Sequence, residues 1–333
     1  MKTSIVLALG LSVSSVELSP AAIAPQQPPT FRTGVELVYV DAFVSHDGRP
    51  LGGLTAGDFE VLDDGVPQTI ELVLREQRSV YAILLLDTSG SVAGEKLEQL
   101  RGAARAFLED LGKDDRAVLL TFSHEVRLHS SLTALPSEVE AALEAVQVGG
   151  ATSLYDAVYA ALSLADPTVG RPVVLVFSDG EDRLSLLPPA DVVTVARESE
   201  ASIFAVELRP SAPGGVALPP SRPEPGTPAR TLFQITPGQD RGLLDRPDAT
   251  AEQTASFLNK VVAETGGRLW RTADAPELRP AFLQVLEEVK NRYLLRYEPQ
   301  AVNPTGWHKL EVRLRKAKGS VRARSGYLAQ RAQ

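Results

Sequence analysis

The sequence predicts an α/β domain with a doubly wound, mostly parallel sheet, inserted in a β-sandwich that the N- and C-terminal segments form together. Between residues 79 and 292, continuous apolar runs alternate with segments of helical periodicity. That pattern indicates parallel strands covered on both faces. At both ends of the chain, apolar and polar residues alternate instead, as in antiparallel sheet. Each terminal segment is too short to form a sandwich alone, so we expect the two to combine.

The composition is that of an ordinary globular protein without cysteine. The chain has 333 residues, 44% of them hydrophobic and 23% charged, with a formal net charge of -8. At about 150 residues per domain, this length predicts two domains. The negative charge argues against nucleic acid as a partner. Without cysteine, disulfides, thiolate metal sites and cysteine nucleophiles are excluded. Any metal must be bound by oxygen or by one of the four histidines.

Residues 1–24 have the order of a secretory signal peptide, with Lys2 first, an apolar stretch next and small residues last. The apolar stretch of about 12 residues is shorter than the roughly 20 that cross a bilayer. We therefore expect a cleaved signal and no transmembrane span in the mature chain. Cleavage after Ala24 and cleavage after Ala21 both fit. The expected destination is the periplasm, the cell surface or the medium, and residues 25–34 are expected to form a linker.

The first part of the predicted sandwich covers residues 35–78. Asp47-Gly48 and Asp64-Gly65 each lie between apolar runs, and Asp-Gly at such a position favours a tight hairpin turn. The second part covers residues 293–329, where we expect strands at 293–297, 309–315 and 321–327. In that part Tyr293 and Tyr297 are expected in the core.

The inserted α/β domain covers residues 79–292. Its expected strands are 80–86, 117–122, 126–128, 173–177, 203–208 and 267–271. Its expected helices are 95–111, 137–146, 154–165, 191–198, one after Thr250 and one that carries Phe282. Ser137 with Glu140, and Thr250 with Gln253, predict capping boxes. Residues 210–249 are rich in proline and glycine, so we expect a long surface insertion there.

Polar oxygen-bearing residues follow two of the buried strands. Asp87, Ser89 and Ser91 come after the first strand, Asp179 follows a later one, and Thr152 lies in a glycine-bearing loop before a helix. In open α/β sheets, ligands bind outside the carboxyl ends of the strands, where the strand order reverses. We therefore expect these five residues to meet in one crevice. Helix capping by Asp87, Ser89 and Thr152, and a plain turn at Asp179, are the alternatives.

Such a set of ligands suits a hard divalent cation. Two carboxylates and three hydroxyls favour Mg²⁺, with Ca²⁺ or Mn²⁺ as alternatives, over zinc or copper. Three neutral hydroxyls do not saturate an octahedral cation, so at least one coordination position stays open to water or to an outside ligand, and an incompletely neutralised cation attracts a carboxylate. The natural activity of such a site is to capture an acidic side chain of a protein partner.

These residues also carry a resemblance. Asp-x-Ser-x-Ser after an apolar strand, then a threonine in a glycine-bearing loop, then Asp-Gly after a later strand resembles the metal-ion-dependent adhesion site of von Willebrand factor type A domains. The flanks, LTAGDFEVLDDGVPQTI before the domain and NRYLLRYEP after it, resemble exported bacterial proteins built around such a domain. The resemblance implies a Rossmann-like fold over about residues 79–292. It implies direct metal binding by Ser89 and Ser91, and by Thr152 once a ligand is bound. Asp87 and Asp179 would act directly or through water.

We expect the protein not to be an enzyme. No G-x-S-x-G motif surrounds Ser89 or Ser91. His46, His124, His129 and His308 are scattered and expected at the surface or in turns. One alternative hypothesis is a metal-assisted hydrolase with Glu181 as general base, and another is a structural β-sandwich protein with a vestigial metal site. A further expectation concerns residues 309–324, whose alternating basic residues indicate a solvated sheet face or a weak contact with an anionic surface.

Overall fold

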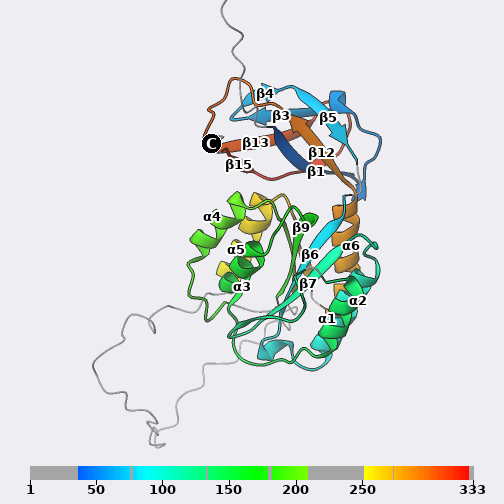
Figure 1. The fold of residues 1–333 in the computed structure, drawn as a ribbon, viewed down its shortest axis with the longest axis vertical. Helices are drawn as coiled ribbons and strands as arrows, with labels where there is room; N and C mark the ends of the chain where they lie inside the picture. Colours follow the sequence, from blue (N-terminus) through cyan, green and yellow to red (C-terminus); the bar gives the residue numbers. More distant parts are fainter. Residues whose placement is uncertain are drawn as a thin grey trace, which may run out of the picture. The chain divides into compact units, whose positions relative to one another are not determined.

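The computed structural model describes residues 37–75, 78–132, 134–178, 182–208, 251–272 and 274–329, apart from the side chains at 251, 252 and 275. The predicted signal peptide, linker and insertion at 210–249 lie outside these residues. The described chain forms one six-stranded sheet with helices on both faces, and two antiparallel sheets built from both ends of the chain (Figure 1). The predicted fold class is confirmed. Among the described helices, none is long and apolar enough to cross a membrane.

The central sheet has the strand order β11-β10-β9-β6-β7-β8. All neighbouring strands are parallel except β8, which pairs with β7 antiparallel at one edge. Every residue of β6, β9 and β10 is buried, as their continuous apolar sequences predict. The strands are β6 (Val80–Asp87), β7 (Arg116–Phe122), β8 (Val126–Leu128), β9 (Arg171–Ser178), β10 (Ser202–Leu208) and β11 (Leu269–Thr272).

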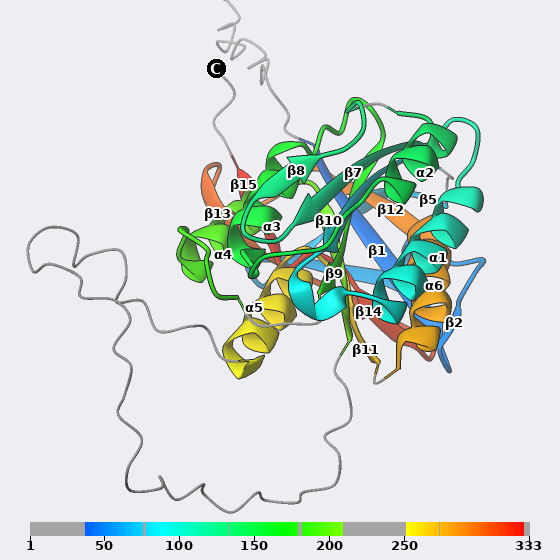
Figure 2. The ribbon, with the colours of Figure 1, turned by 90° about the horizontal axis from the view of Figure 1, so that it is seen from below.

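Three helices cover each face of this sheet (Figure 2). The first layer consists of α1 (Glu95–Glu109), α2 (Pro136–Glu144) and α6 (Leu278–Lys290). The second layer consists of α3 (Leu154–Ser163), α4 (Pro189–Glu198) and α5 (Ala251–Glu264). Short 3₁₀ turns lie at η1 (Ala56–Asp58), η2 (Gly90–Val92) and η3 (Ala275–Glu277). Each layer packs its apolar stripe onto one face of the sheet, which gives the two separate cores that helical periodicity predicts.

Helix α2 begins one residue earlier than predicted, with a different cap. Its first residue is Pro136, and Glu138 accepts a hydrogen bond from the Leu135 N–H (2.8 Å). The predicted capping box of Ser137 and Glu140 is therefore wrong, because proline is favoured at the first helical position and places Ser137 inside the helix. The second predicted box, with Thr250, lies outside the described residues.

The two antiparallel sheets each mix strands from both ends of the chain. In the first sheet, β1 pairs with β12, β14 and β2, and β12 also pairs with β5. In the second sheet, β3 lies between β13 and β4, and β13 also pairs with β15. The N-terminal strands are β1 (Val38–His46), β2 (Arg49–Pro50), β3 (Phe59–Asp63), β4 (Val66–Gln68) and β5 (Ile70–Leu74). The C-terminal strands are β12 (Arg292–Tyr297), β13 (Gly306–Leu314), β14 (Ser320–Arg322) and β15 (Gly326–Ala329).

The Asp-Gly pairs form the tight turns that the sequence predicts. Asp47 and Gly48 have φ of 49° and 76°, and Asp64 and Gly65 have 47° and 81°. Positive φ at both central residues is the geometry of a hairpin turn whose twist matches the adjoining strands. Between the two sheets lies one apolar core, to which alternate residues of β1 and β12 contribute.

A buried polar network connects the two sheets of the sandwich. Asp63 accepts hydrogen bonds from the hydroxyls of Tyr297 (2.8 Å) and Tyr327 (2.9 Å), and its other oxygen lies 2.8 Å from His308 Nδ1. His308 is only 1% exposed, so its expected place at the surface is wrong. The sequence does not reveal this because the partner of His308 is 245 residues away. Burial and the Asp63 hydrogen bond raise the pKa of Tyr297 far above its ordinary value, so it stays a neutral donor.

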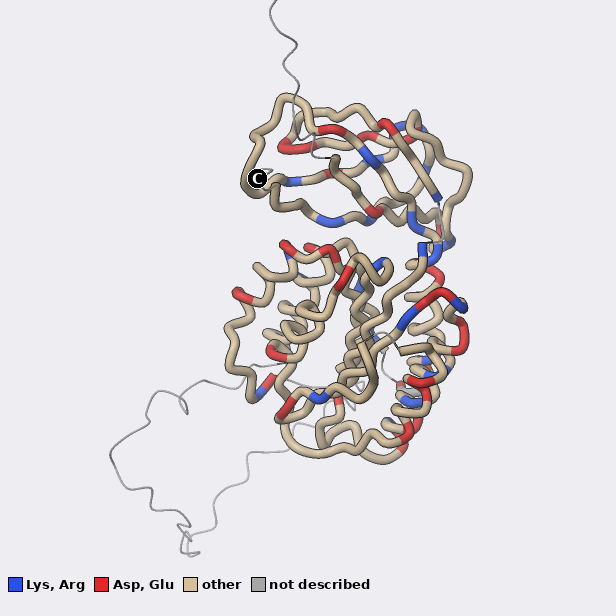
Figure 3. Tube along the Cα trace, in the orientation of Figure 1, with Lys and Arg blue, Asp and Glu red and all other residues tan. Residues whose placement is uncertain are grey.

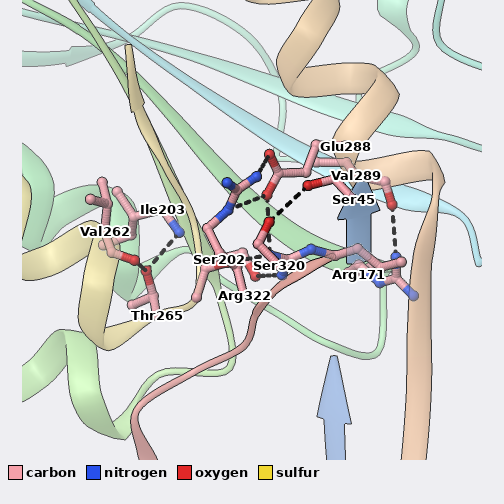
Figure 4. A network of polar contacts seen from close by, with 12 residues as sticks. Ser45, Arg171, Ser202, Ile203, Val262, Thr265, Glu288, Val289, Ser320 and Arg322 are labelled. Atoms are coloured by element: carbon pink, nitrogen blue, oxygen red, sulfur yellow. Dashed lines mark hydrogen bonds and ion pairs between the residues drawn. The ribbon is translucent and has the colours of Figure 1, made fainter. Parts of the chain in front are cut away.

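Arginines at the junction join the sandwich to the α/β domain (Figure 4). Arg171, the first residue of β9, donates to the carbonyl of Val289 near the end of α6 (2.9 Å). Arg292 donates to Ser202 Oγ (2.9 Å) and lies 3.6 Å from Glu288. Since α6 and β12 are separated by one residue, these contacts fix the point where the chain passes from one domain to the other.

The basic C-terminal segment has an exposed face on β13, where Lys309 and Arg313 alternate with buried or half-buried residues, and two of its arginines are paired with acids. Arg322 forms an ion pair with Glu288 of α6, and Arg324 donates to the carbonyl of Arg197 in α4 (2.8 Å). Arg313 is paired with Glu311 (2.6 Å). Figure 3 shows blue and red segments interleaved over the sandwich strands. The expected weak contact with an anionic surface stays a prediction.

Candidate metal centre

The candidate centre lies where the strand order of the central sheet reverses. From β6 the chain proceeds to β7 and β8 on one side, and later to β9, β10 and β11 on the other. The carboxyl ends of β6 and β9 are therefore neighbours at the switch point, with Leu86 in register with Phe177. A crevice at this point is the usual ligand position in open α/β sheets.

Asp87, the last residue of β6, is completely buried, and protein donors hold both of its oxygens. The Ser89 N–H donates to Oδ1 (2.8 Å), and Ser178 Oγ at the end of β9 donates to Oδ2 (3.1 Å). These two hydrogen bonds fix the orientation of the carboxylate. A buried carboxylate costs free energy unless it is hydrogen-bonded or bound to a cation, and these two hydrogen bonds account for the burial of Asp87.

Ser89 and Ser91 bring two hydroxyls together beside Asp87. The turn η2 places Ser89 Oγ and Ser91 Oγ 3.0 Å apart. Ser89 is 2% exposed, whereas Ser91 is exposed, so the pair leads from the buried carboxylate toward solvent. Thr88 lies between Asp87 and Ser89, but its hydroxyl donates to the carbonyl of Phe122 (3.1 Å). We therefore do not count Thr88 among the metal ligands.

Backbone hydrogen bonds tie the loop of Thr152 to the loop of the serines. The Gly90 N–H donates to the Gly150 carbonyl (3.1 Å), and the Gly149 N–H donates to the Thr88 carbonyl (2.8 Å). Gly150 has φ of +80°, and a Cβ there would lie 2.3 Å from His124 Nδ1. Glycine is therefore needed at this position for the two loops to meet.

Thr152 and Ser153 differ in what their hydroxyls do. Ser153 Oγ donates to the carbonyl of Ser123 (2.6 Å), which anchors the loop to the end of β7. The backbone carbonyl of Thr152 accepts from the N–H groups of Arg183 (2.8 Å) and Leu184 (3.0 Å). Thr152 is 4% exposed. The Ser153 hydroxyl is engaged by the Ser123 carbonyl, and Thr152 as the hydroxyl ligand stays a prediction.

Two predicted residues, Asp179 and Glu181, lie outside the described residues, so their roles stay predictions. Their neighbour Ser178 is a residue that sequence reasoning missed. Ser178 is 1% exposed and orients Asp87 from the adjacent strand. The available signal was a serine as the last residue of an otherwise apolar buried strand, directly before Asp179.

The described residues fit a hard divalent cation. Mg²⁺ takes octahedral oxygen ligands at about 2.1 Å, so two adjacent ligands lie about 3 Å apart. The 3.0 Å between Ser89 Oγ and Ser91 Oγ matches this spacing. Asp87 supplies negative charge beside them, and no described residue of this set offers nitrogen or sulfur. The donor set is therefore that of a magnesium, calcium or manganese site.

A second group of metal-ligand types, Asp63, Asp64 and His308, lies in the sandwich, with ligand atoms within 4.8 Å of one another. The hydrogen bonds from Tyr297 and Tyr327 occupy one oxygen of Asp63, and His308 approaches the other. The Lys309 N–H donates to Asp64 (2.9 Å). Mutual hydrogen bonding accounts for this cluster.

Comparison with known proteins places the candidate centre within a shared region. Residues 82–181 match the family model described as von Willebrand factor type A domain. The inter-alpha-trypsin inhibitor heavy chain H4 of Sus scrofa is 28% identical over 128 residues, which are 35% of this chain and 14% of that protein. The heavy chain H6 of Homo sapiens is 27% identical over 133 residues, which are 35% of this chain and 10% of that protein. The chain thus spans only a small part of the length of these relatives.

Among solved structures, a von Willebrand factor type A protein from Catenulispora acidiphila is similar to 88% of this chain and 72% of its own, with 9% identity and a TM-score of 0.46. Proximal thread matrix protein 1 from the mussel byssus, in a form with a zinc-occupied MIDAS motif, is similar to 68% of this chain and 49% of its own, with 12% identity and a TM-score of 0.46. The family match itself begins within β6 and includes Asp87, Ser89, Ser91 and Thr152. Residues 82–181 of this chain therefore match a von Willebrand factor type A domain.

Proposed function

We propose that this chain is an exported, non-enzymatic binding protein that captures an acidic side chain of a partner protein through a divalent cation, most readily Mg²⁺. Asp87, Ser89 and Ser91 would hold the cation, with Thr152 and Asp179 completing the set. The observation that carries the proposal is the spacing of 3.0 Å between the two serine hydroxyls beside a buried, doubly hydrogen-bonded carboxylate. Domains of this family often bind metal at an adhesion site and typically act as binding modules.

The cation would supply the attraction for an acid, and the protein would supply its orientation. The hydroxyls contribute no charge, so with one aspartate as a direct ligand and the other acting through water, a divalent cation keeps net positive charge toward an incoming acid. Ser91 is exposed, which places the open side of the ligand set toward solvent. An acidic side chain that approaches from solvent can then complete the coordination.

Isothermal titration with Mg²⁺ tests the metal centre directly. We expect the mature protein to bind Mg²⁺, and we expect Asp87→Ala to abolish binding. Thr88→Val is the matched control, because Thr88 lies in the same loop but its hydroxyl donates to Phe122. Unchanged Mg²⁺ binding in Asp87→Ala would refute the site assignment, and so would equal losses in both variants.

The capture step has its own test. Immobilised peptides with a single central aspartate should retain the protein in Mg²⁺ and release it in chelator, and the same peptides with asparagine should not retain it. Retention that persists in chelator and with the asparagine peptides would refute capture of an acid. It would not refute metal binding. The proposed export rests on the order of a signal peptide in residues 1–24, and N-terminal sequencing of the protein from the envelope and the medium checks it. The hydrolase hypothesis depends on Glu181, and no described residue adds support to it.

A further inference from the structure

A cavity of about 550 Å³ lies beside the candidate metal centre, between the beginning of α3, the beginning of α4, and α5. Its apolar walls come from Tyr155, Leu187, Val193 and Phe257. The rings of Tyr155 and Phe257 meet edge to face at 4.6 Å between centroids. The volume falls in the range of about 300 to 1,000 Å³ that is usual for ligand pockets.

The cavity and the metal centre share one wall. Tyr155 follows Thr152 by three residues, at the point where the loop becomes helix α3. On the facing side, the chain from Asp182 to Pro188 lines the cavity, and its Arg183 and Leu184 N–H groups donate to the Thr152 carbonyl. The loop that carries Thr152 is therefore hydrogen-bonded directly to a segment that lines the cavity.

Hydrogen bonds hold the wall at 182–188 in place. The N–H groups of Leu186 (2.8 Å) and Leu187 (2.9 Å) donate to the carboxylate of Asp156 in α3. The Asp182 N–H donates to Thr254 Oγ1 in α5 (3.1 Å). Because hydrogen bonds from two helices already fix this segment, ligand binding does not have to order it. The entropy cost of binding is therefore small, which favours affinity.

The rim of the cavity carries exposed positive charge. Leu184 and Leu186, which alternate with the lining residues of the 182–188 segment, are 48% and 69% exposed. Arg183 and Lys260 are exposed at the same rim. The acid of the cavity, Asp182, is 5% exposed and accepts a hydrogen bond from the Tyr155 N–H (3.3 Å). Burial raises the pKa of Asp182 above its ordinary value.

We propose that this cavity receives a large apolar side chain of the partner, such as leucine, methionine or phenylalanine, that lies a few residues from the acid captured by the metal. The inference rests on the proposed function and narrows its partner class to an extended segment with an acidic residue and a nearby apolar residue. The hydrogen bonds between Thr152 and the 182–188 segment connect the metal centre to the cavity. This connection supports one partner segment that contacts both the metal and the cavity. The positive rim favours a segment with acidic rather than basic residues around the apolar one.

Peptide arrays test this assignment with defined probes. Each peptide carries one central aspartate. In one set, a position near the aspartate holds leucine, methionine or phenylalanine in turn. In the other set, all flanking positions hold glycine or serine. We expect Mg²⁺-dependent capture of the apolar peptides to exceed that of the glycine and serine peptides by about tenfold. Ser256→Trp should remove this excess, because Ser256 is exposed on α5 and lines the cavity. Asn259→Trp is the control, since Asn259 is exposed on the same helix but is not part of the lining.

The outcomes separate this inference from the proposed function. Mg²⁺-dependent capture that ignores the flanking residues and Ser256→Trp would overturn the cavity assignment and leave metal capture standing. Capture of apolar peptides that Ser256→Trp removes, but chelator and Asp87→Ala do not, would support the cavity and overturn metal capture. Capture that rises in Ser256→Trp would show that part of this chain occupies the cavity, against the assignment. Failure to capture any peptide would overturn both.

Discussion

Arg171 in the central sheet and Asp41 in the sandwich form an ion pair, with 3.1 Å between Nη2 and Oδ1. Arg171 is 4% exposed and Asp41 24%. Arg171 also donates to Val289 near the carboxyl end of α6, where a positive charge interacts favourably with the helix dipole. One side chain thereby contacts β1 of the sandwich, the central sheet and the last helix of the α/β domain.

We expect Arg171→Met to lower the free energy of unfolding by about 3 kcal/mol, because it leaves Asp41 partly buried without its cation. Urea unfolding measures the loss. Arg296→Met is the matched control: Arg296 pairs with Glu71 at 3.3 Å, and both are about one third exposed. Its loss should stay within about 1 kcal/mol. Equal effects in the two variants would show that the Arg171 contact does not hold the domains together.

The position of the candidate centre could be predicted because it depends on local patterns. Continuous apolar runs mark β6 and β9 as buried strands, and the residues directly after them must lie at one edge of a parallel sheet. Asp87 and Ser89 therefore lie where expected. That the two ends of the chain combine was also predictable, since each terminal segment is too short to form a sandwich alone.

Contacts between distant segments could not be predicted. From the sequence alone, His308 has no visible partner and is expected at the surface. The pairing of β13 with β3 places it beside Asp63. Likewise Ser178 has no visible role until β9 lies beside β6 and its hydroxyl reaches Asp87. Each of these contacts depends on the pairing of strands far apart in sequence, which no local periodicity encodes.

The neighbouring hydroxyls of Thr152 and Ser153 should respond differently to removal. Thr152→Ala should weaken Mg²⁺-dependent capture of aspartate peptides and leave stability nearly unchanged. Ser153→Ala should lower stability by about 1 kcal/mol, because it removes the hydrogen bond to Ser123, and should leave capture intact. Peptide capture and urea unfolding of both variants provide the check. The reverse pattern would transfer the ligand role to Ser153.

Ser178 is expected to act as a positioning residue for Asp87. Ser178→Ala should lower Mg²⁺ affinity by about tenfold, because partners behind a metal ligand orient it. Ser202→Ala is the control: Ser202 is a buried serine at the beginning of the adjacent strand β10, and its hydroxyl accepts from Arg292. That change should affect stability but not Mg²⁺ affinity. Titration calorimetry on both variants distinguishes them, and an unchanged affinity in Ser178→Ala would contradict the role.

Glu264 is expected to give the stability a defined pH dependence. Burial opposes its ionisation, but hydrogen bonds from Arg197 (2.6 Å) and from Ser325 together lower the pKa of Glu264 below its ordinary value of 4.5. A carboxylate whose folded pKa is lowered stabilises the protein above its unfolded pKa, and this contribution disappears as the pH falls through the folded pKa.

We therefore expect Glu264→Gln to cost about 1 kcal/mol near neutral pH, a modest value because Arg197 is 40% exposed. The difference from the unchanged protein should shrink progressively as the pH falls below 4.5. Urea unfolding across this pH range measures it, with Glu287→Gln, an exposed acid of α6, as the control that should change little. Because Ser325 leads into β15 while Glu264 ends α5, the lost stability would report on the attachment of the sandwich to the α/β domain. A difference that stays constant with pH would show that the Glu264 contacts act through packing rather than charge.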